Sequence, residues 1–248
     1  MQLLHNRSYD IALLRITSIA TLSILIVNIF FPITSFASSE IIDVSDNDCA
    51  GAGSSQVRSS LGHFDTGIVS VSGAGTDWGK NSCLGSVIHH FNKYALYVAT
   101  NYPTGHCPAG SSRQGAYNCG YNLGLFDVRY ASSQGAHAST WFLDVEGAGS
   151  NFYASHSLNS SFLYGLASSL QTRGASVIGY YSTGPTWQAI TGGWDSGNYA
   201  WHATGSNGSP PSSVARAACR TNFTGGPVVY YQWIVGGLIS GIDYDAPC

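Results

Sequence analysis

The sequence has few charged residues and no run of lysines or arginines. Of its 248 residues, 10 are Lys or Arg and 13 are Asp or Glu, which gives a formal net charge of −3. Nucleic-acid-binding domains carry basic patches that neutralise phosphates, so this composition argues against a nucleic-acid partner. The low charged fraction and the many Gly, Ser, Tyr and Trp residues are instead typical of an extracellular surface.

Three common functional motifs are also missing. The sequence has no Cys-x-x-Cys, its eight histidines show no metal-ligand spacing, and no Gly-x-Ser-x-Gly is present. The first two absences argue against a structural or catalytic metal, and we predict no cofactor. The third removes the strand-to-helix elbow that would present a nucleophilic serine.

The N-terminus has the pattern of a secretory signal peptide. Arg7 and Arg15 supply positive charge, and an apolar stretch follows over residues 16–36. Ser35-Phe36-Ala37 places small residues where a signal peptidase reads them, so we predict a signal peptide over 1–37 and a secreted, extracellular protein. The alternative is an uncleaved anchor, because the apolar stretch is long enough to span a bilayer. Residues 38–248 then form one domain, since no internal repeat or linker divides them.

All six cysteines lie beyond the predicted signal peptide, and an even number in an exported chain indicates disulfides. Six cysteines allow fifteen pairings. Their order along the chain suggests three bonds, Cys49–Cys83, Cys107–Cys119 and Cys219–Cys248.

Short apolar runs alternate with helical patterns along the chain. Alternation of this kind predicts a parallel sheet, and eight strands predict a (β/α)8 TIM-type barrel. Helical patterns cover residues 83–94, 118–134 and 157–173. The eight strand-like runs are 40–45, 67–72, 94–100, 140–146, 176–182, 198–203, 228–234 and 238–243.

The most informative of these runs ends in Asp144-Val145-Glu146 and is followed by Gly147. Residues i and i+2 of a strand point to the same face, so Asp144 and Glu146 project together. Two adjacent carboxylates repel each other, and at least one then keeps its proton near neutral pH. A protonated carboxyl is the group that cleavage of a glycosidic bond requires.

Polar and aromatic residues collect at the ends of the other predicted strands, where a (β/α)8 barrel places its active site. Acids and aromatic rings together are typical of a carbohydrate cleft. The residues concerned are Asp43, Asn101, Tyr181, Trp201, Gln232, Asp243 and Asp245.

An ordered series of short motifs resembles glycoside hydrolase family 25, the (β/α)8 lysozymes, and within it a secreted, cysteine-containing bacterial branch. The resemblance extends over residues 41–248. The motifs are Ile42-Asp43-Val44-Ser45, Phe142-Leu143-Asp144-Val145-Glu146, Gly179-Tyr180-Tyr181-Ser182, Trp201-His202-Ala203, Tyr231-Gln232-Trp233 and Gly241-Ile242-Asp243-Tyr244-Asp245.

The resemblance implies a catalytic set of Glu146, Asp144, Asp43 and Asp243. Glu146 would be the general acid, and Asp144 would assist the substrate's acetamido group as it attacks its own anomeric carbon, with net retention of configuration. Asp43 and Asp243 would tune the acid and position water or sugar. The resemblance further implies a substrate-binding set of Tyr181, Trp201, Gln232, Asp245 and Asn101.

The family's last motif has Asp followed two residues later by Asn, whereas this chain has Asp243-Tyr244-Asp245. Either aspartate is therefore a candidate for the cleft. Trp201 is equally well explained as a core residue, because large aromatic side chains usually pack inside.

Three functions from different classes fit the sequence. The first is a secreted monomeric glycosidase acting on a peptidoglycan-like polysaccharide, with no contact to a membrane after signal cleavage. The second is an inactive barrel that binds glycan at the cell surface. The third is a structural surface protein, suggested by the low charge and the abundance of Gly, Ser and Tyr.

Overall fold

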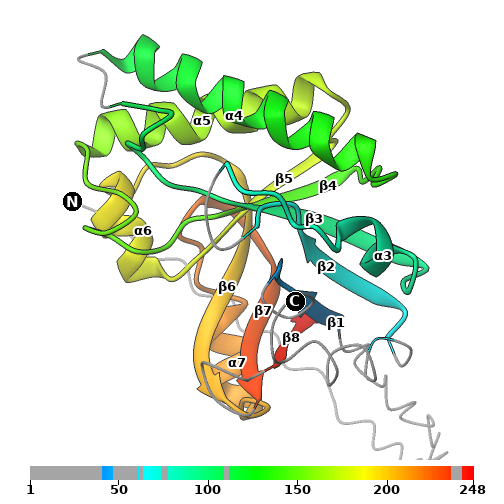
Figure 1. The fold of residues 1–248 in the computed structure, drawn as a ribbon. Helices are drawn as coiled ribbons and strands as arrows, with labels where there is room; N and C mark the ends of the chain where they lie inside the picture. Colours follow the sequence, from blue (N-terminus) through cyan, green and yellow to red (C-terminus); the bar gives the residue numbers. More distant parts are fainter. Residues whose placement is uncertain (1–40, 47–60, 62–63, 74–77, 109–111, 236–241) are drawn as a thin grey trace, which may run out of the picture. The chain divides into compact units, whose positions relative to one another are not determined.

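Eight strands close into a barrel in the order of the sequence, β1 to β8 (Figure 1). The computed structural model describes residues 41–46, 61, 64–73, 78–108, 112–235 and 242–248. The predicted signal peptide and Cys49 lie outside these residues. The strands are β1 (Ile41–Val44), β2 (Thr66–Ser70), β3 (Lys93–Ala99), β4 (Thr140–Asp144), β5 (Val177–Ser182), β6 (Asn198–Asn207), β7 (Gly225–Val235) and β8 (Ile242–Pro247).

The predicted barrel fold is confirmed, but its last strand does not run as the alternating pattern predicted. Strands β1 to β7 pair in parallel, whereas β8 is antiparallel to both β7 and β1. Antiparallel neighbours need no helical crossover, which agrees with the short connection between β7 and β8. The beginning of β8, not its end, therefore lies beside the C-terminal ends of the other strands. We call this end of the barrel the rim.

Helices connect most of the parallel strands. They are α3 (Leu84–Ile88), α4 (Arg113–Ser133), α5 (His156–Thr172), α6 (Gly184–Thr191) and α7 (Ser212–Ala218). The helix predicted over 83–94 is only one turn and a half long, because Lys93 already begins β3. Helix α4 starts five residues before the predicted 118, with Ser112 Oγ accepting from Gly115 N at 3.1 Å as an N-cap. Helix α6, of eight residues, and helix α7, which is mostly exposed, were not predicted.

Helices α4 and α5 lie against each other on one side of the barrel (Figure 1) and pack closely at glycines. A Cβ atom added to Gly120 would overlap the backbone carbonyl of Phe162. One added to Gly165 would overlap the backbone of Tyr117. These two positions accept no side chain, because the backbones themselves are in contact there.

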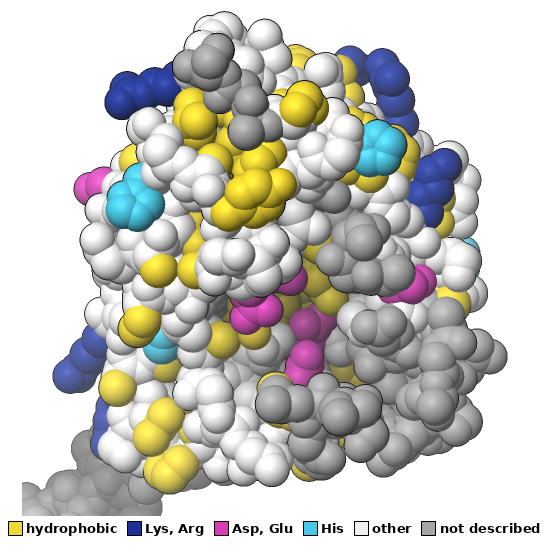
Figure 2. All heavy atoms as spheres, turned by 60° about the vertical axis from the view of Figure 1, so that its left-hand side comes forward, with side chains coloured by type: hydrophobic (Ala, Val, Ile, Leu, Met, Phe, Trp, Pro, Cys, Tyr) yellow, Lys and Arg dark blue, Asp and Glu magenta, His cyan; other side chains and the backbone are white. Residues whose placement is uncertain are grey.

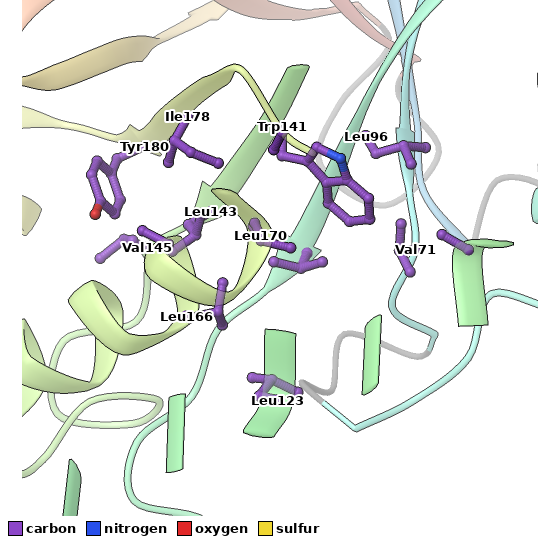
Figure 3. Close-up of a cluster of buried hydrophobic side chains, with 14 of the residues drawn as sticks. Val71, Leu96, Leu123, Trp141, Leu143, Val145, Leu166, Leu170, Ile178 and Tyr180 are labelled. Carbon is purple, nitrogen blue, oxygen red and sulfur yellow. The ribbon is translucent and has the colours of Figure 1, made fainter. Parts of the chain in front are cut away.

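The hydrophobic residues form two separate cores. The larger lies between the strands and the α4–α5 pair, and Figure 3 shows its helical side chains facing those of the strands. The smaller fills the barrel interior. The larger core includes Val71, Leu96, Leu123, Trp141, Leu143, Val145, Leu166, Leu170, Ile178 and Tyr180. The interior core consists of Ile41, Ile68, Ala95, Tyr97, Phe142 and Trp201.

Two of the predicted disulfides are confirmed. Cys107 is bonded to Cys119 and Cys219 to Cys248, with Cα–Cα distances of 5.7 and 5.4 Å. Cys83 is also disulfide-bonded. None of the helices in the described part of the chain has both the length and the apolar composition that crossing a bilayer requires.

Candidate functional site

The end of β4 carries the two acidic residues that the sequence singles out. Asp144 is the last residue of the strand, and Glu146 follows it by two positions. The backbone between them is held by β5, because Val145 N donates to Tyr181 O at 2.9 Å and Ser182 Oγ donates to Val145 O at 2.8 Å. Strand-like pairing thus continues one residue beyond β4 and fixes the direction in which Glu146 leaves the sheet.

Two further contacts hold the same segment, and of the residues that make them only Gly147 was expected from the sequence. The Thr100 hydroxyl, just after β3, donates to the backbone carbonyl of Asp144. On the other side Gly147 turns the chain with φ at 67°, and its carbonyl accepts from Asn151 N at 2.7 Å. The signal for Thr100 was a hydroxyl residue at the end of a strand, which is not specific alone.

The carboxyl groups of Asp144 and Glu146 affect each other's titration. Burial raises the pKa of Asp144 well above its usual range, and the nearby Glu146 charge raises it further. Glu146 is exposed at the rim, but the surrounding protein removes part of its hydration and raises its pKa as well. Coupled groups of this kind titrate as a unit, so the pair keeps a proton to higher pH than an isolated carboxyl would.

The side chain of Tyr181 lies at the centre of the acidic residues. Burial raises the pKa of its hydroxyl well above the usual value, and four carboxylates raise it further. The hydroxyl therefore stays protonated and acts as a hydrogen-bond donor. In decreasing order of effect, the four carboxylates are those of Glu146, Asp144, Asp243 and Asp43. The structure thus brings all four predicted catalytic residues around one side chain.

The amide of Gln232, on β7, links two of these groups. Tyr181 donates its hydroxyl proton to Gln232 Oε1 at 2.5 Å, and Gln232 Nε2 donates to Asp43 Oδ2 at 3.0 Å. The chemistry fixes the amide orientation, since the tyrosine hydroxyl supplies a proton and the carboxylate accepts one. Gln232 is 5% exposed and holds Asp43 and Tyr181 in a fixed relation.

The antiparallel direction of β8 distinguishes Asp243 from Asp245. Asp243 pairs with Asp43 in the register of β1 and β8, which places it at the rim. Asp245 pairs with Ile41 and lies deeper, with no exposed surface. The question that the last motif leaves open is answered by strand direction: Asp243 belongs to the acid group around Tyr181.

Asp245 instead interacts with the interior core. Its Oδ1 accepts from Trp201 Nε1 at 2.6 Å. Burial raises its pKa well above the usual range, the Trp201 hydrogen bond lowers it, and the Asp243 charge raises it. Trp201 is 1% exposed and lies beneath Tyr181, with ring centroids 4.5 Å apart. Trp201 and Asp245 therefore form the floor of the site and do not present a surface to solvent.

Asn101, from the predicted substrate-binding set, and His202, from the Trp201-His202-Ala203 motif, have distinct environments. Asn101 follows β3 and lies two positions beyond Ala99, which pairs with Asp144, so alternation places it on the cleft side. Its Oδ1 is buried and has no hydrogen-bond partner among the described residues. His202 faces the opposite way from Trp201, toward Phe223 at 6.0 Å between ring centroids, and burial lowers its pKa. His202 thus belongs to the outer layer.

Figure 2 shows acidic side chains gathered in a hollow in the middle of one face, with hydrophobic side chains around it. Within the part of the chain that the structure describes, no three His, Cys, Asp or Glu side chains are arranged to hold a metal ion. The fold and site define a (β/α)8 barrel with a rim of coupled carboxyl groups, an arrangement able to carry out acid catalysis on a sugar.

The chain is similar to known proteins in part of its sequence and in its fold. A search of protein-family profiles finds no match. The chain is 38% identical over 56 residues to a probable GH family 25 lysozyme of Dictyostelium discoideum, a stretch that covers 23% of this chain and 26% of that protein. The match thus spans about a quarter of the relative's length.

Solved structures extend the similarity to the whole barrel. A muramidase from Trichobolus zukalii superposes with a TM-score of 0.55 at 13% identity, over 84% of this chain and 93% of the other. A glycosyl hydrolase 25 of Streptococcus pneumoniae gives 0.50 at 19% identity, over 85% and 87%. The chain therefore has the lysozyme-like fold of glycoside hydrolase family 25.

Proposed function

We propose that this chain is a glycosidase that cleaves the glycan strands of peptidoglycan, with Glu146 as the general acid. The observation that carries the proposal is the group of four carboxylates around the Tyr181 hydroxyl at the barrel rim. Proteins of the same fold named lysozyme or muramidase support the choice of substrate.

Glu146 is the carboxyl with access to a ligand, because it is the exposed member of the coupled pair. A glycan bound over the rim would remove the remaining water around Glu146 and raise its pKa further. The proton shared with Asp144 would then reside on Glu146, from which it passes to the leaving glycosidic oxygen.

Asp144 is half-buried beside Glu146, and its buried Oδ1 has no hydrogen-bond partner among the described residues. That oxygen can accept a hydrogen bond from the N–H of a substrate acetamido group. The acetamido carbonyl would attack the anomeric carbon while Glu146 protonates the leaving group. Glu146, now a carboxylate, would take a proton from the water that opens the cyclic intermediate, which gives net retention.

Asp43 and Asp243 supply negative charge near the sugar carbon that becomes electron-poor in the transition state. The Gln232 amide keeps Asp43 at a fixed distance from Tyr181, so this charge needs little reorganisation during the reaction. Asn101 adds a buried acceptor on the same side of the cleft.

The proposal predicts how the rate depends on pH. The general acid must be protonated, so activity is present below the pKa of Glu146 and is lost as the pH rises through it. Because that pKa is raised from its usual value, the loss occurs above about pH 4.3, where an unperturbed glutamate ionises. A rate profile measured on soluble glycan fragments checks this, and a fall centred below that value would contradict it.

The decisive experiment compares residues 38–248, produced with their disulfides, with the same chain carrying Glu146→Gln. Both are incubated with purified peptidoglycan, and new reducing ends are followed together with fragment masses. We expect the wild type to release fragments and Glu146→Gln to be slower by about 100- to 10,000-fold, the usual contribution of a general acid.

Equal melting temperatures of the two proteins would show that the substitution leaves the fold intact, as expected for an exposed side chain. A fully active Glu146→Gln would overturn the assignment of the acid. If neither protein releases fragments although both bind peptidoglycan, the chain is a glycan-binding barrel without activity.

We also propose that the chain is exported through residues 1–37 and acts as a monomer. Expression of the full chain with a C-terminal tag, followed by mass analysis of the protein in the medium, tests the export. A mature N-terminus at Ser38 is the expected result, and a cell-bound chain that retains residues 1–37 would instead support the membrane anchor.

A further inference from the structure

A groove on the outside of the barrel has the composition of a second sugar site. It lies where the beginnings of α4 and α5 meet the end of α6, and it encloses about 470 Å³. All of its lining residues are separate from the acids of the rim. They include Arg113, His156, Ser160, Tyr164, Thr191 and Trp194.

Aromatic rings continue from this groove across the helices. The rings of Trp194 and Tyr164 meet edge to face at 6.5 Å, Tyr164 and Tyr117 are 5.7 Å apart, and Tyr117 and Tyr121 are stacked at 6.1 Å. Tyr164 is 56% exposed. Isolated exposed aromatic residues are common on protein surfaces, whereas a continuous series bordered by hydroxyl groups indicates a binding surface.

The aromatic wall of the groove is rigid. Trp194 is stacked on Trp187 at 5.9 Å, and Trp187 Nε1 donates to the Trp194 carbonyl at 3.0 Å. Thr191 Oγ1 accepts from Trp194 N at 3.1 Å. A ring held in this way offers its surface to a ligand without losing conformational entropy on binding.

The polar groups of the groove favour an anionic ligand. The exposed Arg113 begins α4, and no acidic side chain is among the lining residues. Ser161 donates its proton to the Ser157 carbonyl at 2.7 Å, which leaves the Ser161 oxygen to accept from a sugar hydroxyl. A guanidinium binds carboxylates with two parallel hydrogen bonds.

From these contacts we propose that the groove is a second carbohydrate site, which binds a glycan strand bearing carboxylate groups. The inference rests on the proposed function, because a polymeric substrate is long enough to contact both the rim and the helices. The chain segment that leads from Glu146 to α5 also carries an exposed aromatic residue, Tyr153, which is 63% exposed.

Binding at the groove would keep the enzyme on insoluble glycan and raise the effective concentration of strands at the rim. It would leave the turnover of a short fragment unchanged, since such a fragment occupies the rim alone. The signature of the site is therefore a loss of polymer binding and polymer hydrolysis without a loss of fragment hydrolysis.

The test uses Tyr164→Ala and Arg113→Ala, each alone and combined with Glu146→Gln. Matched controls are Tyr199→Ala, at an exposed tyrosine, and Arg220→Ala, at an exposed arginine, neither of which lines the groove. Binding to peptidoglycan sacculi is measured by co-sedimentation in the Glu146→Gln background, where no hydrolysis interferes. Melting temperatures verify that each variant is folded.

We expect Tyr164→Ala and Arg113→Ala to bind sacculi about three- to tenfold more weakly, the effect of losing one aromatic or charged contact. Both controls should bind like their parent. If the groove variants bind and degrade sacculi like the wild type, the second site is overturned while the proposed function stands. If sacculi binding falls but no glycan is ever cleaved, the groove is a sugar site and the proposed glycosidase activity fails.

Discussion

The rim of the barrel and the α4–α5 pair outside it differ in composition: the rim gathers ionisable side chains, whereas the helices pack against each other at glycines. At the rim, carboxyl groups lie close to one another around Tyr181, which is costly for stability because each disfavours the ionisation of the next. In the helix pair, backbones meet at Gly120 and Gly165 with no room for a methyl group. The rim keeps unfavourable interactions that can serve chemistry, and the helix pair provides the close packing that keeps the barrel folded.

Two adjacent residues of β5, Tyr180 and Tyr181, face these two different environments. Tyr181 faces the acids and Gln232, while Tyr180 faces Trp187 and Trp194 on the helical side. Changes on one side of the sheet should alter activity, and changes on the other should alter stability. Of the four variants that follow, Gly165→Ala and Tyr181→Phe test this division directly, in addition to Glu146→Gln.

The largest effect on stability should follow from replacing Cys219 and Cys248 by serine. This disulfide closes a loop with a sequence separation of 29, which contributes about 3–4 kcal/mol by chain entropy. Because β8 is antiparallel, the bond holds the end of β8 opposite to Asp243. We expect a large fall in melting temperature with unchanged activity in the cold. Loss of activity in the still folded protein would show that the bond also positions Asp243.

Gly165→Ala should have the next largest effect on stability, since the added methyl group meets the backbone of Tyr117. Forced separation of the helices should cost about 1–3 kcal/mol, which lowers the melting temperature by roughly 2–4 °C per kcal/mol. Gly105→Ala is the control, because nothing lies within 4 Å of its added Cβ. Equal melting temperatures of the two variants would contradict the close packing of α4 and α5.

Tyr181→Phe should reduce activity with little change in stability. The substitution removes the hydroxyl that bonds to Gln232 and frees the amide to move away from Asp43. We expect about a tenfold slower release of reducing ends, equal to roughly 1.4 kcal/mol of barrier. Tyr180→Phe, on the opposite side of the strand, should leave the rate unchanged, and an equal loss in both variants would remove the distinction between the two faces.

The smallest effect on stability is expected for Asp245→Asn, which should raise the melting temperature instead of lowering it. An unfolded aspartate ionises near about pH 4, whereas burial raises the pKa of Asp245 well above that value in the fold. The carboxyl therefore favours the folded state at low pH and loses this contribution as the pH rises toward the folded pKa. Asparagine can still accept from Trp201 without this cost.

The melting temperature of Asp245→Asn relative to the wild type should thus increase from pH 4 to pH 7. A difference that is constant or decreases over this range would contradict the burial of an ionisable Asp245. Asp65→Asn, at an exposed aspartate, provides a control for the loss of one surface charge.

The amino-acid sequence by itself determined the alternation of strands and helices, and with it the barrel. It also determined the pairing of Asp144 with Glu146, because two residues on one strand share a face whatever surrounds them. The Cys107–Cys119 and Cys219–Cys248 bonds followed from order along the chain. These features depend on local spacing.

Only the tertiary structure decided the direction of β8, and therefore which aspartate joins the acids. The apolar pattern within β8 does not give its direction, and the short connection after β7 permits an antiparallel strand without indicating which aspartate then meets the acids. The same holds for Trp201, whose burial under Tyr181 depends on strands far away in the sequence, and for the Asp43–Gln232 bond, which joins residues 189 positions apart. Chain spacing determines which residues share a strand face, but the closing of the barrel determines which of them meet and how far each is removed from water.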